Sequence, residues 1–85
     1  MKCELCGREV EEYTTHHLIP RSEDGQPDNI AIVCRPCHSM IHRLFSNREL
    51  AENYSSIKGL KDHPEIEKFI RWVRKQDPNK KVKIR

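Results

Sequence analysis

The segment CRPCHSMIH, residues 34–42, places two cysteines and two histidines within one short stretch. Cys34 and Cys37 form a C-x2-C pair, and a second pair, Cys3 and Cys6, precedes it with 27 residues between the two pairs. Thiolates from two such pairs can occupy the four corners of a tetrahedron around Zn²⁺, at Zn–S distances of about 2.3 Å, and leave no open coordination position. The spacing therefore predicts a closed, structural zinc site. The alternatives are an iron–sulfur cluster or free thiols.

The size and composition of the chain explain why such a site is needed. A chain of 85 residues, of which 35% are hydrophobic and 34% charged, buries little apolar surface and usually depends on disulfides or a metal. The N-terminal sequence MKCELCGREV lacks the apolar segment of a secretory signal, and no stretch approaches the roughly 20 apolar residues that span a bilayer. We therefore expect a cytoplasmic protein without membrane association. Disulfides are rare in that reducing compartment, which favours zinc.

Local sequence signals predict a small α+β fold. Residues 13–19 are rich in β-formers and are expected to form a strand that ends at a proline. Residues 21–29 contain Asp, Gly, Pro and Asn and are expected to form a loop, and residues 30–33 a short buried strand. A helix is expected from Cys34 onwards, with Pro36 in its first turn, where the missing N–H costs nothing.

The C-terminal half is expected to be helical. The pattern predicts a helix over residues 48–55, a break at Lys58-Gly59 and a second helix over residues 64–77. We expect an apolar stripe of this second helix to pack onto the first half of the chain. Residues 1–46 would then form the zinc-supported core, and residues 47–85 a helical, basic extension of the same domain. The stripe has i, i+3, i+4, i+7 spacing and consists of Ile66, Phe69, Ile70 and Val73.

The histidines predict a second metal site. His38 and His42 are four residues apart, so they share one face of a helix and can bind one metal ion. Neighbouring side chains of a strand point to opposite faces, so one of His16 and His17 can be a third ligand while the other projects beside the metal. Zinc at the four cysteines would bring this pair close to His38. Each histidine alone could be an ordinary surface residue, as we expect for His63 at a helix start.

Three motifs in this order and spacing, the first C-x2-C pair, HHLIPRS and DNIAIVCRPCHSMIH, resemble the HNH endonuclease family in its variant with a four-cysteine zinc site. The resemblance covers residues 3–45. It implies the ββα-metal finger, in which two strands, a loop and a helix surround one catalytic metal ion. The three letters of the family name would fall on His17, Asn29 and His38.

The resemblance also implies roles for individual residues. By analogy with members that have a histidine pair, His16, His38 and His42 would bind the catalytic metal and His17 would be the general base. Asn29 would brace the loop so that the base keeps its orientation. The implied reaction is hydrolysis of phosphodiester bonds in DNA, leaving 5′-phosphate and 3′-hydroxyl ends. An imidazole-rich site suits Mn²⁺, Ni²⁺, Co²⁺ or Zn²⁺ better than Mg²⁺, which prefers carboxylate and water ligands.

The charge distribution favours a polyanionic partner. Residues 1–46 contain 5 basic and 7 acidic residues, whereas residues 47–85 contain 11 basic and 6 acidic ones, in agreement with the net charge of +3. A basic surface of this kind favours double-stranded DNA bound through its phosphates, with low sequence specificity, although a merely solvated helix face is the alternative. Trp72 could stack on a base but is expected to be partly buried. The candidate phosphate-binding residues are Arg21, Arg43, Lys68, Arg71, Arg74, Lys75, Lys80 and Lys81.

The alternative function is a non-catalytic, zinc-ribbon-like module that binds nucleic acid or protein. Such a module needs the four cysteines but has no use for four histidines clustered around them, so the sequence favours the nuclease. A homodimer or a protein partner could supply the specificity that so small a chain lacks.

Overall fold

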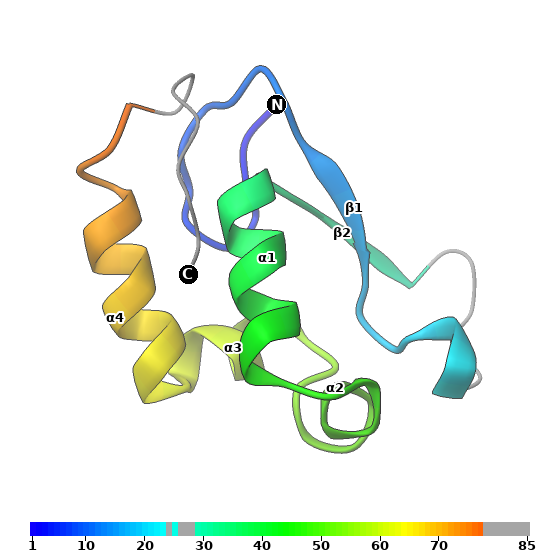
Figure 1. Cartoon of the computed structure of the whole chain (residues 1–85). Helices are drawn as coiled ribbons and strands as arrows, with labels where there is room; N and C mark the ends of the chain where they lie inside the picture. The colour runs from blue at the N-terminus through cyan, green and yellow to red at the C-terminus, as the bar shows by residue number, and fades with distance from the viewer. Residues whose placement is uncertain (24, 26–28, 78–85) are drawn as a thin grey trace.

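The computed structural model describes residues 1–23, 25 and 29–77, which form a small α+β fold (Figure 1). The predicted fold class is confirmed, because a two-stranded sheet is followed by helices. No helix in this part of the chain is long and apolar enough to cross a membrane. In chain order the elements are β1 (Thr14–His17), the 3-10 helix η1 (Arg21–Glu23), β2 (Ile30–Val33), α1 (Arg35–Leu44), α2 (Asn47–Asn53), α3 (Ile57–Asp62) and α4 (Pro64–Val73).

The sheet is an antiparallel pair of β1 and β2. His16 lies opposite Ala31, and beyond the strands the Leu18 amide donates to the Asn29 carbonyl at 3.0 Å. Because side chains alternate along a strand, His16 is fully buried whereas Thr15 is exposed. The pleat of β1 therefore decides which of the two adjacent histidines enters the interior.

The N-terminal loop holds the first cysteine pair against β2. Gly7 has a φ of 83°, in the left-handed region that favours glycine, and its amide donates to the Cys3 carbonyl at 2.9 Å. The Glu4 amide donates to the Ile32 carbonyl at 2.8 Å, and the Glu4 carboxylate accepts from the Ile32 amide. The first cysteine pair is thus attached to the strand that leads directly into the second pair.

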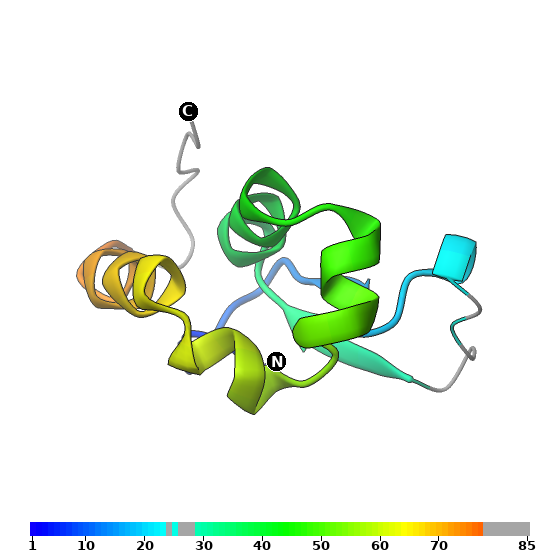
Figure 2. The ribbon, with the colours of Figure 1, turned by 90° about the horizontal axis from the view of Figure 1, so that it is seen from below.

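One cluster of buried apolar side chains joins the two halves of the described chain. Leu5 of the N-terminal loop, Val33 of β2 and Ile41 of α1 are fully buried in it. In both ribbon views α1 lies between α4 and the sheet, and α4 contacts α1 (Figures 1 and 2). The stripe that the periodicity of α4 predicts is buried in the same cluster and comprises Ile66, Phe69, Ile70 and Val73.

The predicted break at Lys58-Gly59 is wrong, because α3 spans these residues. The Ser56 hydroxyl accepts from the Gly59 amide at 3.0 Å and caps the helix, and Leu60 is fully buried. Glycine costs about 1 kcal/mol relative to alanine in a helix interior, whereas full burial of a leucine side chain contributes about 1.5–3 kcal/mol. Burial of Leu60 therefore outweighs the local preference against a helix.

The limits of α4 differ partly from the prediction. His63 is its N-cap, with Nδ1 accepting from the amide two residues later at 3.1 Å, in agreement with the expected helix-start role. The helix ends at Val73 and does not continue to Asp77. The amides of Lys75 and Gln76 bond to carbonyls only three residues earlier, at 3.1 and 3.0 Å, so the chain tightens into turns. Side-chain contacts to the N-terminal loop then hold this end of the helix.

Candidate metal centres

The four cysteines converge as their spacing predicts. All four are buried, and their Sγ atoms lie within 4.8 Å of one another. The Sγ atoms of Cys6 and Cys34 are 3.9 Å apart. Four sulfurs bound to zinc at about 2.3 Å stand about 3.8 Å apart at the corners of a tetrahedron. The buried cysteines could therefore bind a structural metal such as zinc.

The four thiols are close enough to perturb one another's pKa values. Hydrogen bonds from Cys34 and Cys37 lower the pKa of Cys3 to about 6, and those from Cys3 and its neighbours lower the pKa of Cys6. The pKa values of Cys34 and Cys37 are raised, chiefly because each shares its proton with Cys3. Four thiolates at this distance repel one another unless a divalent cation neutralises them. The donor set and its spacing both fit Zn²⁺.

Arg8 contacts this cluster, and sequence reasoning missed it. Its Nε donates to Cys6 Sγ at 3.4 Å and its Nη2 to Cys34 Sγ at 3.5 Å, while Nη1 donates to the Gln76 carbonyl at 3.2 Å. Arg74 adds a second link, because its Nε donates to the Cys6 carbonyl at 2.7 Å. The two guanidinium groups join the cysteine cluster to the end of α4. No local pattern could reveal this, since the partners are 68 residues apart.

Replacing Arg8 by alanine is expected to lower the free energy of unfolding by about 1–3 kcal/mol, because hydrogen bonds to charged partners are lost. Urea unfolding with saturating zinc measures this loss. Arg48→Ala is the matched control, since Arg48 is exposed and, among the described residues, forms an ion pair only with Glu52 four residues on, a surface contact that contributes little to stability. Equal destabilisation by both variants would contradict the role given to Arg8.

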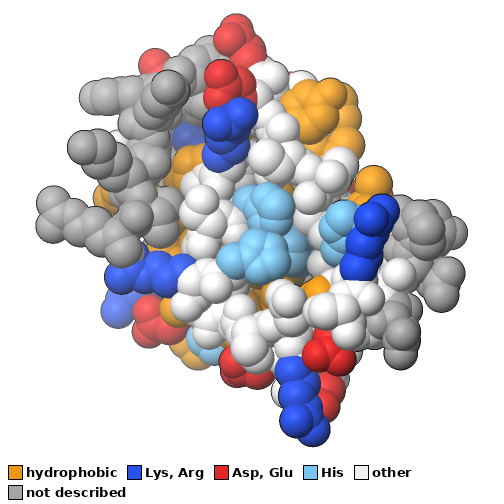
Figure 3. Space-filling model, turned by 45° about the vertical axis from the view of Figure 1, so that its right-hand side comes forward, with side chains coloured by type: hydrophobic (Ala, Val, Ile, Leu, Met, Phe, Trp, Pro, Cys, Tyr) orange, Lys and Arg blue, Asp and Glu red, His pale blue; other side chains and the backbone are white. Residues whose placement is uncertain are grey.

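Three histidines form a second cluster. The ligand nitrogens of His16 from β1 and of His38 and His42 from α1 lie within 4.8 Å of one another. The ring centroid of His16 is 5.3 Å from the centroid of His38 and 5.3 Å from that of His42. The centroids of His38 and His42 are 4.8 Å apart. Histidine side chains gather at the centre of the face in Figure 3. One metal ion could thus be shared by the strand and the helix.

The surroundings of His16 are the strongest indication that this cluster suits a metal ion. Its ring is fully buried, and neither Nδ1 nor Nε2 has a hydrogen-bond partner among the residues that the structure describes. Buried polar atoms are nearly always paired, and an unpaired one costs about 1–3 kcal/mol. The His16 ring faces the imidazoles of His38 and His42. The Nε2 atoms of these two rings are only 3.0 Å apart. A bound cation would satisfy the buried ring.

The electrostatics of this cluster oppose positive charge on the rings. Burial, then the charges of His38, His42 and His17, lower the pKa of His16 to about 4. Burial also lowers the pKa values of His38 and His42. No carboxylate belongs to the cluster within the described residues. The site therefore offers neutral imidazole donors.

His17 and Asn29 lie beside the cluster rather than in it. His17 is half-buried, and its charge acts on both His16 and His38. Asn29 acts through its backbone, since its carbonyl accepts the Leu18 amide. Its side chain makes no hydrogen bond to residues 1–23, 25 or 29–77. The structure thus brings His17 near the three converging rings without making it a fourth member.

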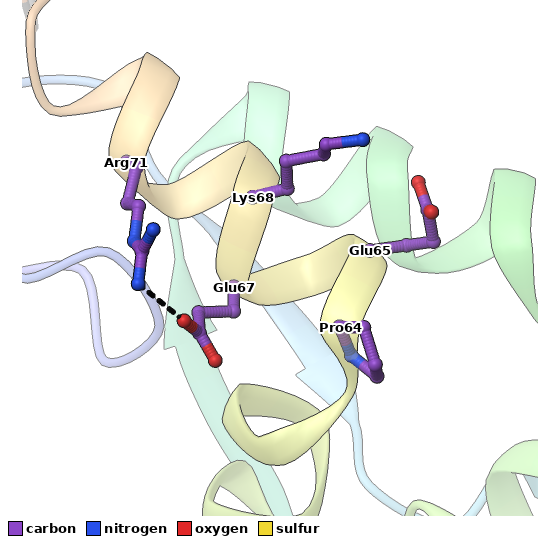
Figure 4. A pocket seen from close by; sticks show the side chains of 5 residues that line it. All are labelled: Pro64, Glu65, Glu67, Lys68 and Arg71. Atoms are coloured by element: carbon purple, nitrogen blue, oxygen red, sulfur yellow. Dashed lines mark hydrogen bonds and ion pairs between the residues drawn. The ribbon is translucent and has the colours of Figure 1, made fainter.

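The predicted phosphate-binding residues differ in their surroundings. Lys68 and Arg71 both line a hollow on α4, and the Arg71 side chain bends to Glu67 at 2.6 Å (Figure 4). Arg74 donates to the N-terminal loop as described above. Trp72 remains 45% exposed and contacts Phe69 at a centroid distance of 5.8 Å. Six of the predicted phosphate-binding residues are exposed, namely Arg21, Arg43, Lys68, Arg71, Arg74 and Lys75. The other two, Lys80 and Lys81, lie outside the described residues.

A strand pair and a helix that share three histidines, next to a closed cysteine cluster, have the architecture of ββα-metal nucleases. The profile of the HNH endonuclease family matches residues 3–44, from the first cysteine to the end of α1. Protein YisB of Bacillus subtilis (strain 168), named as uncharacterized, is 43% identical over 83 residues, which cover 98% of this chain and 83% of that protein. No solved structure matches.

The chain therefore belongs to the HNH endonuclease family, as the resemblance of its motifs predicts. Members of this family generally act on nucleic acids, so membership suggests a nuclease-type activity. The matched residues contain both clusters, whereas α2, α3 and α4 lie outside the match.

Proposed function

We propose that this protein is a metal-dependent endonuclease that hydrolyses phosphodiester bonds in DNA. The observation that carries the proposal is the convergence of His16, His38 and His42 on one point, with His17 beside them. A module that only binds would need the four cysteines alone. In such a module the burial of His16, which has no hydrogen-bond partner among the described residues, would cost stability and bring no benefit.

The three converging imidazoles would hold one divalent cation. Three ligands on a rigid strand and helix leave further coordination positions open, as a catalytic site requires. Neutral nitrogen donors favour Mn²⁺, Ni²⁺, Co²⁺ or Zn²⁺ over Mg²⁺. When bound, the cation supplies Lewis acidity at the scissile phosphate and the departing 3′-oxygen.

His17 is proposed as the general base. A neutral imidazole accepts a proton from the attacking water near neutral pH, and only one of its nitrogens is needed for that transfer. The hydrogen bond between the Leu18 amide and the Asn29 carbonyl lies directly after His17, just beyond the end of β1. Asn29 would thereby keep the base in a fixed orientation relative to the three ligands.

The basic residues are proposed to hold duplex DNA by its phosphates. Lys68 and Lys75 are exposed and form no ion pair with another described residue. Arg71 pairs with Glu67 at the surface, where an ion pair contributes about 0–1 kcal/mol and is easily exchanged for a phosphate. Arg21, Arg43, Lys80 and Lys81 complete the proposed set, with Arg74 at its edge. Contacts to phosphates carry no sequence information, so low specificity is expected.

Cleavage of supercoiled plasmid tests the proposal. We expect the zinc-loaded protein to convert the plasmid to nicked or linear forms with Mn²⁺, Ni²⁺ or Co²⁺, and to be inactive with EDTA. His38→Ala should reduce the rate at least about 100-fold, because it removes a ligand of the cation that stabilises the transition state. His63→Asn is the matched control, since it removes a histidine outside the cluster and keeps a residue type that caps helices well.

Two results would contradict the proposal. If the protein binds DNA but cleaves it with none of these ions, the binding module is the better assignment. If His38→Ala cleaves as fast as the wild-type protein, the three-histidine cluster is not the active site.

A further inference from the structure

We infer that Thr14 is a positioning residue of the three-histidine site, whose hydroxyl holds the His38 ring with its Nδ1 protonated and its Nε2 free for a metal. This inference rests on the proposed function, because it assigns a role to Thr14 at the proposed catalytic metal. It concerns the supporting contacts behind the ligands, for which neither the motifs nor the family match provides a residue.

The geometry identifies the donor and the acceptor. The distance between Thr14 Oγ1 and His38 Nδ1 is 2.8 Å. The same hydroxyl donates its hydrogen to the carbonyl of Val33, its partner across the sheet, at 3.3 Å. A threonine hydroxyl has one hydrogen and two lone pairs. Because that hydrogen is used on Val33, Oγ1 accepts from His38, and the proton of the ring is on Nδ1.

The tautomer of His38 determines whether its Nε2 atom can bind a metal ion. With Nδ1 protonated, His38 Nε2 has the lone pair, and this atom lies 3.0 Å from His42 Nε2 within the cluster. The opposite tautomer would direct an N–H group into the site and could not bind a cation there. Partners of this kind typically affect metal affinity by about 10–100-fold.

The neighbouring threonine shows that residue type alone does not explain the contact. Thr15 is also β-branched and favoured in strands, yet it is exposed and has no hydrogen bond to a histidine within the described chain. Thr14 faces the helix because the pleat directs alternate side chains inward, the direction that His16 also takes. The strand thus provides one ligand and the support for another.

Three variants test this role. Thr14→Val keeps the β-branched shape and removes the hydroxyl, Thr14→Ser restores a hydroxyl, and Thr15→Val is the control on the exposed face of the same strand. Each full-length protein is prepared with one zinc per chain, verified by elemental analysis. Calorimetric titration with Co²⁺ measures affinity for the second site, and two-bond ¹⁵N–¹H correlation spectra of the metal-free histidine site show which ring nitrogen carries the proton.

We expect the wild-type spectrum to show His38 protonated on Nδ1. Thr14→Val should weaken Co²⁺ binding about 10–100-fold, retain its zinc, and show a mixture of both tautomers. Thr14→Ser should bind within about threefold of the wild type, and Thr15→Val should be unchanged.

A wild-type His38 protonated on Nε2 would overturn the inference, and this measurement does not depend on any variant folding. Wild-type Co²⁺ affinity in a folded Thr14→Val protein would also overturn it. If the expected tautomer and affinities appear but no DNA is cleaved, the role of Thr14 at the metal stands and the proposed nuclease function fails.

Discussion

The Cys34→Ser variant is expected to be largely unfolded. Cys34 is buried, its Sγ lies 3.9 Å from that of Cys6, and it accepts a hydrogen bond from Arg8. Zinc binding supplies on the order of 10 kcal/mol of folding free energy in small zinc domains. The total stability of a domain is only about 5–15 kcal/mol. Loss of one ligand should therefore remove most of the stability of so small a chain.

Far-UV circular dichroism and zinc content per chain measure this result. The His38→Ala variant is the control, since it lies next to Cys37 in α1 but removes a member of the other cluster. It should keep one zinc per chain and a helical spectrum. Chelation of zinc from the wild-type protein should reproduce the behaviour of Cys34→Ser. A native-like spectrum of Cys34→Ser, with cooperative thermal unfolding, would show that the cysteine cluster is not needed for folding.

The His17→Ala variant is expected to lose most of its cleavage rate while it keeps its metal. Removal of a general base lowers a rate by about 10²–10⁴-fold. His17 does not belong to the three converging rings, so the affinity for Co²⁺ should change little. kcat and kcat/KM should fall by the same factor, since the lost interaction is made only in the transition state.

Alanine variants of the adjacent residues His16 and His17 are expected to give different results. His16→Ala should lose both Co²⁺ binding and cleavage, because His16 is the buried member of the cluster. His17→Ala should lose cleavage alone. Nicking at the wild-type rate by His17→Ala would exclude it as the base, and loss of Co²⁺ binding would make it a ligand.

Much of the fold and of both clusters could be predicted because their signals are local. The C-x2-C spacing, the i, i+4 interval between His38 and His42 and the stripe of α4 each follow from the geometry of one turn or one helix. The family resemblance of residues 3–45 added the expected roles, and the family match confirms that resemblance. The division of the chain into residues 1–46 and 47–85 stays a prediction.

Local signals failed where distant parts of the chain compete with them. Lys58-Gly59 has the composition of a break, yet burial of Leu60 keeps α3 intact. The helix α4 ends at Val73, and just beyond it Arg74 and the Gln76 carbonyl contact the N-terminal loop. Such contacts cannot be read from a window of ten residues.

The sequence by itself predicted which residues could bind metal ions and in which pairs they occur, because cysteine and histidine spacing follows from local backbone geometry. The local pattern left open which histidine of the adjacent pair turns inward, and the family resemblance implied His16; the tertiary structure shows His16 buried and reveals which groups contact the clusters from behind. The pairing of His16 with Ala31, the contact of Thr14 with His38 and the position of Arg8 all depend on packing between segments far apart in the chain. Interactions of that kind form when the whole chain is folded, so no local pattern specifies them.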